Sequence, residues 1–333
     1  MDKAAAFEIY GPAAREVLAA FPIEPADLVF VNLSENLTFR VSDARDGAPY
    51  VLRLHRPGYH EDAALHSEPV WTAALAAAGI FVPQPVAARG GGYHVPVTVA
   101  QAGERRWAGL ARWIEGEVLA DLVDRETDPA VIAGHFERLG ALMAALHNQA
   151  AAWTPPAGFH RHSLDAEGLM GEAPFWGPFW DHPVFDAEER ALMLQTRDAI
   201  RAALIRLGRD PSTFSVIHAD LHPGNVLVGE GDVAVIDFDD TAFGWHAYDL
   251  AVALVFYQDH AHYADFRDAL VRGYRTVRPL DDAVVGLLPM FLLIRRMVQI
   301  GWLHQRPELG TPADLPARKD IILALARAFQ APC

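Results

Sequence analysis

The chain has 333 residues, of which 51% are apolar, and it carries a formal net charge of -15. At about 100–200 residues per domain, this length predicts two or three domains with ample material for a buried core. The acidic balance excludes a general nucleic-acid binder, which needs a basic surface to displace counterions. The single cysteine, Cys333, allows no disulfide within the chain, which favours a reducing compartment.

No segment of the sequence is expected to enter a membrane. The N-terminus, MDKAAAFEIYGPAAREV, lacks the apolar stretch of a signal peptide. The longest apolar run, Ala283 to Ile294, contains Pro289 and is too short to span a bilayer. We therefore expect a cytoplasmic chain with no membrane or nucleic-acid partner.

The first third of the chain is expected to be rich in β-strands. Apolar residues form a run over 28–31 and then alternate with polar ones over 37–41, the period of a half-buried strand. Further strands are expected over Tyr50–Leu54, Tyr93–Val99 and Gly109–Ile114. A helix is expected from about Glu61 to Ala78, with Leu65, Trp71 and Leu75 on one face.

The character of the sequence changes after Gly116, where helical periodicity takes over. One helix is expected around 136–146, a second over Ala187–Leu207, and more from about Tyr248 onward. An irregular stretch, Trp153–Pro183, and two short strands, Val226–Val228 and Val233–Ile236, interrupt the helices. We predict an α+β fold with a small sheet-rich lobe and a larger helical lobe, joined near 112–116.

Reactive side chains concentrate between His218 and Asp240. A glycine-rich tetrapeptide over 229–232 separates two apolar runs, which predicts a β-hairpin. Counting outward from its midpoint pairs Asn225 with Ile236, one position from Asp237. Asn225 and Asp237 are therefore expected at the same open end of the hairpin.

Asp220 precedes this hairpin, in the loop that enters it. A carboxylate and an amide carbonyl side by side suit Mg²⁺, which binds oxygen ligands and shares its shell with phosphates. A further carboxylate nearby can orient a hydroxyl and accept its proton. This division of tasks is the one that phosphoryl transfer requires. The alternative is a plain turn, in which Asp and Asn side chains only cap the backbone.

The pattern His218-x-Asp220-x-x-x-x-Asn225 with Ile236-Asp237-Phe238 is similar to the signature of the aminoglycoside phosphotransferase and choline kinase superfamily. Within it, the chain most resembles the branch of type II homoserine kinases and the bacterial stress-response kinase. The resemblance implies a bilobal protein-kinase-like fold. Residues 1–111 would form the nucleotide-binding lobe with a small antiparallel sheet, 112–116 the hinge, and 117–333 a mostly helical catalytic and substrate lobe.

The resemblance also implies roles for individual residues. ATP and Mg²⁺ would be the cofactors, with the metal held by Asn225 and Asp237 and with Asp220 as the catalytic residue. Arg53 matches the lysine that such kinases aim at the phosphates, and Glu68 matches the helix carboxylate that pairs with it. The other nucleotide-binding positions would be Ser34 and Asn36 in a polar turn, and Arg112, Trp113 and Ile114 at the join. Asp249 resembles the aspartate that braces the catalytic loop.

Two of these positions can also be judged from the residues themselves. Glu68 shares a helix face with Leu65, Trp71 and Leu75, and a buried carboxylate needs a partner; a solvated helix charge is the alternative. Arg53 departs from the family, whose lysine it replaces, and arginine and lysine are not interchangeable at phosphates. A lysine at position 53 is expected to maintain or improve turnover.

The expected function is transfer of the ATP γ-phosphate to a hydroxyl of a small amino alcohol, amino acid or amino sugar. Aromatic and acidic residues occur in Trp153–Pro183 and after Tyr248. They either recognise this acceptor through cation–π and charge contacts or only pack in the protein core. Three alternatives stay open. They are a serine/threonine protein kinase of the stress-response type, a pseudokinase that only binds, and a metallohydrolase that uses His218, Asp220 and His222.

Overall fold

The computed structural model describes residues 3–33, 36–229 and 232–330. The chain divides into two compact units, and each contains segments from distant parts of the sequence. The first unit comprises Met1–Gly116, Pro155–His160 and Ala234–Asp239. The second comprises Glu117–Thr154, Arg161–Val233 and Asp240–Cys333.

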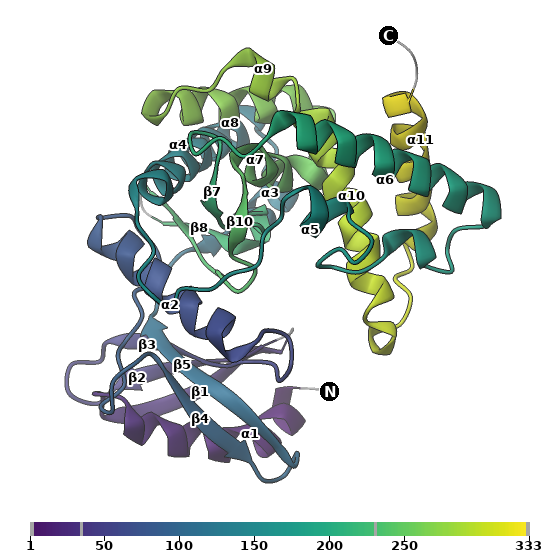
Figure 1. Ribbon diagram of the computed structural model, residues 1–333. Coiled ribbons are helices and arrows are strands. Elements are labelled where there is room, and N and C mark those ends of the chain that lie inside the picture. Colours follow the sequence, from purple (N-terminus) through teal and green to yellow (C-terminus); the bar gives the residue numbers. More distant parts are fainter. Residues whose placement is uncertain (1–2, 34–35, 230–231, 331–333) are drawn as a thin grey trace. The chain divides into compact units, whose positions relative to one another are not determined.

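A five-stranded antiparallel sheet forms the centre of the first unit (Figure 1). Its strands follow the order β1-β2-β3-β5-β4 and comprise β1 (Pro25–Leu33), β2 (Leu37–Asp43), β3 (Pro49–Leu54), β4 (His94–Val99) and β5 (Glu104–Arg112). Burial alternates along β2 and β3, as the sequence pattern predicted. The expected strand over Gly109–Ile114 is shifted, because β5 begins five residues earlier and ends at Arg112.

Helix α1 (Lys3–Val17) packs against β1 and β4 and closes one face of this sheet (Figure 1). Its residues Tyr10 and Val17 join the core formed by the inward-facing side chains of the strands. The sequence did not predict this helix, because Gly11 and Pro12 stand in its middle and both residues usually disfavour helix interiors. Burial of one apolar face outweighs their low helix propensity.

Helix α2 (Asp62–Ala77) agrees with the helix expected between about 61 and 78. The expected inner-face residues Leu65, Trp71 and Leu75 are all buried. Trp71 meets Phe238 edge to face, with ring centroids 5.6 Å apart. This contact fixes the segment Ala234–Asp239 against α2 within the first unit.

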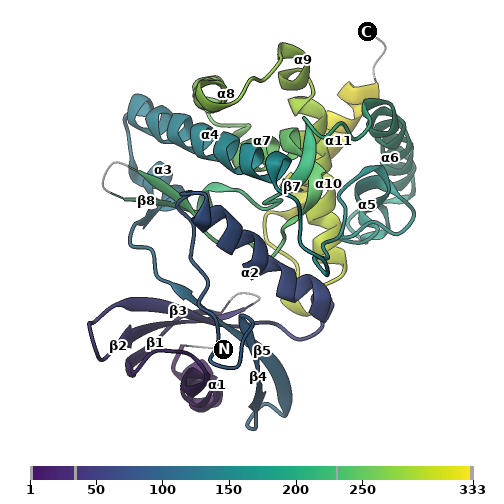
Figure 2. The ribbon, with the colours of Figure 1, turned by 60° about the vertical axis from the view of Figure 1, so that its left-hand side comes forward.

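Helices dominate the second unit, as expected. They are α3 (Leu119–Arg125), α4 (Pro129–Ala152), α5 (Ala166–Met170), α6 (Ala187–Leu207), α7 (His246–Leu254), α8 (Tyr263–Val277), α9 (Asp282–Val285), α10 (Leu288–His304) and α11 (Leu315–Gln330). Helix α4 packs closely along α8 (Figure 2). Two small sheets lie among them, β10-β7 (Ala242–Trp245 with Phe214–Ile217) and β6-β8-β9, in which β6 is Glu117–Val118, β8 is Val226–Val228 and β9 is Val233–Val235.

The predicted hairpin corresponds to β8 and β9, which are neighbours in their sheet. The backbone N–H of Gly229 donates to the carbonyl of Asp232 at 3.0 Å. Gly229 and Asp232 are the residues that the predicted hairpin register places opposite each other. The stretch Trp153–Pro183, expected to be irregular, contains only short α5 and a single 3-10 turn over Phe179–Asp181.

Among the described residues, one helical segment, Asp282–His304, is long and apolar enough to cross a membrane by length and composition alone. It is longer than the run expected from the sequence, because Pro289 stands in the first turn of α10, where proline is tolerated. Just over half of its most apolar stretch, 56%, is buried inside the structure. A core helix passes the same test, so the segment carries no membrane assignment.

Candidate active site

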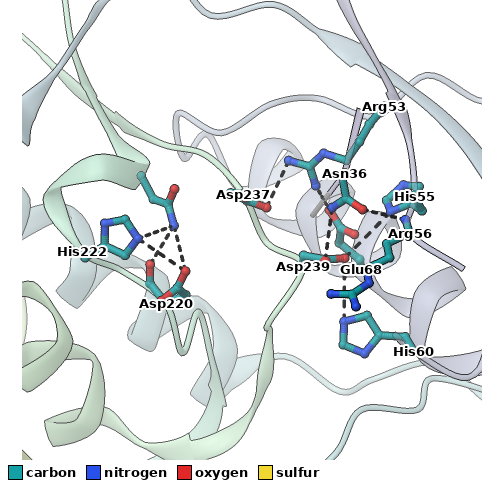
Figure 3. A network of polar contacts seen from close by, with 11 residues as sticks. Asn36, Arg53, His55, Arg56, His60, Glu68, Asp220, His222, Asp237 and Asp239 are labelled. Atoms are coloured by element: carbon teal, nitrogen blue, oxygen red, sulfur yellow. Dashed lines mark hydrogen bonds and ion pairs between the residues drawn. The ribbon is translucent and has the colours of Figure 1, made fainter. Parts of the chain in front are cut away.

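Arg53 lies between two carboxylates in the first unit (Figure 3). Its Nη1 is 3.3 Å from Glu68 Oε1, and its Nη2 is 3.1 Å from Asp237 Oδ1. Burial alone would lower the pKa of Arg53, but the charges of Asp237 and Glu68 outweigh it and raise the pKa. The pairing of Arg53 with Glu68 expected from the sequence is therefore present, and the guanidinium is fixed in its charged form.

Asp237 has a backbone conformation that side chains rarely adopt, with φ of 64°. Among the described non-glycine residues, only Asp237 and Ala219 have positive φ. Such residues are unusual in proteins and concentrate at functional sites. Ala219 and Asp237 both lie within the motif that the sequence analysis identified. The Asp237 side chain is 40% exposed, although it forms an ion pair with Arg53.

Asn36 helps to hold Asp239 in the first unit. Its side-chain amide donates to Asp239 Oδ2 at 3.2 Å, and its oxygen accepts from the backbone N–H of Arg56 at 2.9 Å. Asn36 thus orients an acidic residue from the segment that carries Asp237. Ser34, the other residue expected in this turn, lies outside the described residues.

Asp220 stands in the loop after β7 and pairs with Arg295 on α10. Burial would raise the pKa of Asp220, but the charge of Arg295 and a contact with His222 outweigh it and lower the pKa to about 2. Asn225 donates its amide N–H groups to the Asp220 carbonyl at 2.9 Å and to Oδ2 at 3.2 Å. Because the side-chain nitrogen of Asn225 makes both of these hydrogen bonds, its side-chain oxygen is the atom available to bind another group.

Asp249 on α7 braces this loop, as the resemblance implied. Its carboxylate accepts from the backbone N–H of His218 at 3.0 Å and of Ala219 at 2.8 Å. These bonds hold Ala219 in its strained conformation, with φ of 69°. Burial is the main cause that raises the pKa of Asp249 to about 6.

Two of the three residues expected at the join between the lobes, Arg112 and Trp113, already form backbone hydrogen bonds next to the sheet. The backbone N–H of Arg112 donates to Gln84, and that of Trp113 donates to Pro49, at 2.9 and 3.1 Å. The Arg112 guanidinium lies 4.6 Å above the Tyr50 ring. Only Ile114 among the three expected residues keeps its N–H outside these bonds.

Of the three residues proposed for a metallohydrolase, His222 and Asp220 lie together, with Nε2 3.5 Å from Oδ2, but the three do not form a group whose ligand atoms lie within 4.8 Å of one another. His218 Nδ1 accepts from the Asp220 N–H, and His222 Nδ1 accepts from the Gly224 N–H at 3.0 Å. In the described part of the chain, the ligand atoms that gather within 4.8 Å of one another belong to another set, His55, Glu68 and Asp239. This rival interpretation therefore loses its geometric basis.

Sequence reasoning missed Arg295, although a signal was present. The residue stands in an apolar helix, where a charge requires a partner. Trp176 lies beneath it, 5.8 Å from the guanidinium carbon. Trp176 is 3% exposed, and Phe179 and Trp180 are 0% and 6% exposed, which favours the packing interpretation of these aromatics.

Comparison with known proteins identifies the family. Residues 29–283 match the profile of the phosphotransferase enzyme family, APH. Homoserine kinase of Granulibacter bethesdensis is 30% identical over 298 residues, which cover 85% of this chain and 83% of that protein. The structure of the microcompartment-associated aminopropanol kinase is 30% identical with a TM-score of 0.76, and the match covers 95% of this chain and 94% of that one.

A further solved structure has the same fold. Amicoumacin kinase in complex with AMP-PNP, Ca²⁺ and Ami aligns with a TM-score of 0.78 at 22% identity, over 98% of this chain and 96% of that one. The protein-kinase-like α+β fold and the branch expected from the sequence are thereby confirmed. The family and its kinase neighbours support small-molecule kinase activity, and the chain belongs to the phosphotransferase enzyme family.

Proposed function

We propose that this chain transfers the γ-phosphate of ATP to a hydroxyl of a small molecule of the amino alcohol, amino acid or amino sugar class. Proteins named for kinase activity on homoserine and aminopropanol are each 30% identical to it, which supports this substrate class. The observation that carries the proposal is the surroundings of Asp220. Its carboxylate pairs with Arg295 and accepts a hydrogen bond from Asn225.

The proposed nucleotide site belongs to residues 1–111, with a hinge at 112–116 and the catalytic and substrate lobe at 117–333. Arg53, oriented by Glu68, would contact the phosphates, and the turn with Ser34 and Asn36 would cover them. The backbone N–H groups of Arg112 and Trp113 already bind within the sheet. The adenine edge would therefore meet Ile114, with the other two join residues beside it.

Asn225 and Asp237 offer the oxygen donors that Mg²⁺ prefers. The amide oxygen of Asn225 is available because its nitrogen binds Asp220, and the Asp237 carboxylate is 40% exposed. When bound, ATP would supply the phosphoryl group, and Mg²⁺ held by these residues would neutralise part of the phosphate charge. Whether Asn225 and Asp237 meet at one ion stays a prediction, since they belong to different units.

Asp220 would orient the acceptor hydroxyl and take up its proton as the transfer proceeds. A pKa of about 2 makes Asp220 a weak base, so its main contribution would be to position the attacking oxygen. We also propose a cytoplasmic location and no nucleic-acid or membrane partner, in keeping with the acidic charge and the lack of an internal disulfide.

The test is Asp220→Ala, which should abolish transfer and leave nucleotide affinity nearly intact. Asp314→Ala is the control, because Asp314, just before α11, also pairs with an arginine, Arg318, at 2.7 Å. Turnover and ATP-analogue binding are measured for both variants. If Asp220→Ala kept most of its turnover, the assigned role would be wrong.

The acceptor is identified by a phosphate-transfer screen of small alcohols, amino acids, aminoglycosides and generic protein substrates, with and without Mg²⁺. Transfer to a small alcohol supports the proposal. Transfer only to proteins would favour the stress-response type of protein kinase. Nucleotide binding without transfer to any acceptor would favour a pseudokinase.

A further inference from the structure

A cavity of about 340 Å³ lies within the second unit, between the end of α6, the start of α7, the end of α8, and α9 and α10. None of the described residues assigned to the proposed reaction lines it. Its volume falls at the lower end of the range that small-molecule sites occupy. The cavity is therefore large enough for a small ligand that is neither the nucleotide nor the acceptor.

The inner wall of this cavity is aromatic and buried. Trp245, Tyr274 and Phe291 line it and are 2%, 1% and 0% exposed. Val284 and Leu287 line it nearer the surface, where both are partly exposed. Such a wall favours an apolar ligand body, because contact removes apolar surface from water.

One guanidinium supplies positive charge to the cavity. Arg278, directly after α8, is half-buried and is the only arginine or lysine among the described residues that line it. It donates to the Asn148 side-chain oxygen and to the Ser212 carbonyl, each at 2.5 Å. Both acceptors are neutral, and no carboxylate in the described part of the chain pairs with Arg278. Because a guanidinium has five N–H groups and binds carboxylates most strongly, Arg278 keeps donors for an anion.

The other charged groups around the cavity do not replace such an anion. His246 Nε2 lies 2.9 Å from the Ser215 hydroxyl. Burial holds the pKa of His246 well below its usual range, so its imidazole is neutral. Asp281 stands on the exposed rim, directly before α9, where solvent and salt screen its charge.

We propose that this cavity binds a small monocarboxylate with an apolar body. Its carboxylate pairs with Arg278, and its body packs against Trp245 and Phe291. An aromatic body gains most, because rings in offset or edge-to-face contact attract one another beyond the area that they bury.

Tyr274 links the cavity to the Asp220 loop. Its hydroxyl lies 2.9 Å from His147 Nδ1, and His147 Nε2 lies 3.2 Å from Asp249. Asp249 in turn accepts from the backbone N–H of Ala219, at 2.8 Å. A ligand that packs against Tyr274 therefore acts on the loop that carries Asp220. This link rests on the proposed phosphotransfer, whereas binding itself is measured without nucleotide or acceptor.

The experiment titrates the full chain with 4-phenylbutyrate and with 4-phenylbutyramide, which has the same body without the charge. Calorimetry should give one site per chain. The carboxylate should bind at least about 10-fold more tightly than the amide, since hydrogen bonds to a charged group are roughly twice as strong as neutral ones. In the wild-type chain, nuclear Overhauser effects should join the phenyl protons of the probe to the rings of Trp245 and Tyr274.

Variants test the role of the guanidinium. Arg278→Gln should weaken binding of the carboxylate by at least about 10-fold and leave the amide nearly unchanged, while Arg278→Lys should keep the preference for the carboxylate. Arg272→Gln is the matched control on the same helix, because Arg272 pairs with Glu137 at 3.0 Å on the exposed surface. Asp281→Asn should maintain or tighten binding of the carboxylate.

Equal affinity for the two probes, nuclear Overhauser effects that avoid Trp245 and Tyr274, or wild-type affinity in Arg278→Gln would each overturn the site. So would an equal loss in Arg272→Gln and Arg278→Gln. The two wild-type results decide the matter if Arg278→Gln does not fold.

The link to the Asp220 loop has its own measurement. Saturating 4-phenylbutyrate should change the kcat of the wild type by about 5-fold, at the lower end of the usual coupling between two sites. The same probe concentration should leave the kcat of Arg278→Gln unchanged. An unchanged wild-type kcat would overturn the link alone. A chain that binds the probe but transfers phosphate to no acceptor would contradict the proposed function and leave the site in place.

Discussion

Arg53 uses both arms of its guanidinium, one on Glu68 and one on Asp237. An ammonium group has no planar fork and would have to contact both carboxylates from a single nitrogen. From the sequence alone, a lysine at position 53 is expected to maintain or improve turnover. The geometry favours the opposite prediction, because the arginine contacts both the α2 carboxylate and the motif aspartate.

We therefore predict that Arg53→Lys lowers kcat/KM by about 10- to 100-fold, since a hydrogen bond to a charged group contributes roughly 1.5–3 kcal/mol. Steady-state kinetics on the acceptor found by the screen measures the change. Arg45→Lys is the control, because Arg45 forms a comparable pair with Asp43 away from the motif. An Arg53→Lys enzyme with wild-type kcat/KM would restore the sequence-based expectation.

Arg295 is a positioning residue for Asp220. Its side chain is only 9% exposed, so its removal would leave a largely buried carboxylate without its counter-charge. Breaking such a pair from one side destabilises a protein by roughly 3–5 kcal/mol when both groups are buried. Asp220 is 23% exposed, which reduces the expected loss to the lower part of that range.

The prediction for Arg295→Met is a large fall in kcat with little change in nucleotide KM, and Arg295→Lys should recover part of the activity. The neighbouring variant Arg296→Met is a matched control, because Arg296 binds Val255 and Gln258 instead. Kinetics and urea unfolding are measured for all three. Equal kcat losses in Arg295→Met and Arg296→Met would show that only helix packing matters.

Single residues of the site were predictable where they lie close together in sequence. Asp220 and Asn225 are five positions apart, and the structure joins them by a hydrogen bond. The pair of Asn36 and Asp239 spans 203 positions, and no local pattern links its members. The same distance in sequence hides the relation of His55 and His60 to Asp239.

At the scale of elements, local signals predicted α2, α6 and the β8–β9 hairpin, because apolar periodicity and a glycine-rich turn lie within the segment itself. Strands β7 and β10 escaped notice, since each has only four residues and gains its stability from a partner far along the chain. Helix α1 was missed because Gly11 and Pro12 hide its periodicity.

The contact between α4 and α8 depends on two glycines that let the backbones approach. A Cβ added at Gly140 would lie 2.0 Å from the carbonyl oxygen of Leu270, and one at Gly273 would lie 1.8 Å from that of Glu137. Neither carbonyl belongs to a flexible side chain. Any substitution at either position must therefore push the two helices apart.

We predict that Gly273→Ala destabilises the chain by about 1–3 kcal/mol or more, the usual cost of overpacking. Gly134→Ala, on the outer side of α4 with nothing within 4 Å of the added Cβ, should instead stabilise by about 0.5–1 kcal/mol. Urea unfolding of both variants provides the comparison. A neutral Gly273→Ala would mean that the helices separate at little cost.

At the scale of the whole chain, a buried polar network connects three helices of the second unit to the Asp220 loop. His147 on α4 lies 2.9 Å from the Tyr274 hydroxyl on α8 and 3.2 Å from Asp249 on α7. Its ring also stacks on that of His246 at 4.2 Å. The stability of the helical unit and the geometry of the Asp220 loop therefore depend on the same residues.

This network predicts a specific dependence of stability on pH. Burial is the main cause that lowers the pKa of His147 from its ordinary value of 6.5 to about 3. Between these two values, the unfolded chain binds a proton at His147 that the folded chain does not. The contribution of His147 to stability is thus fully present above pH 6.5 and is lost as the pH falls toward 3.

His147→Gln removes that titration while it keeps a side chain able to hydrogen-bond. The free energy of unfolding of the wild type, minus that of the variant, should rise by more than about 1 kcal/mol between pH 4 and pH 7, because one pKa unit corresponds to about 1.36 kcal/mol. Asp249, whose raised pKa makes stability fall with rising pH, lies 3.2 Å from His147, so the difference reports the coupled titration of the two groups. Urea unfolding at several pH values measures the slope. If the difference in unfolding free energy did not change with pH, His147 would have the same pKa in the folded and unfolded chains. Burial in the network would then not lower the pKa of His147.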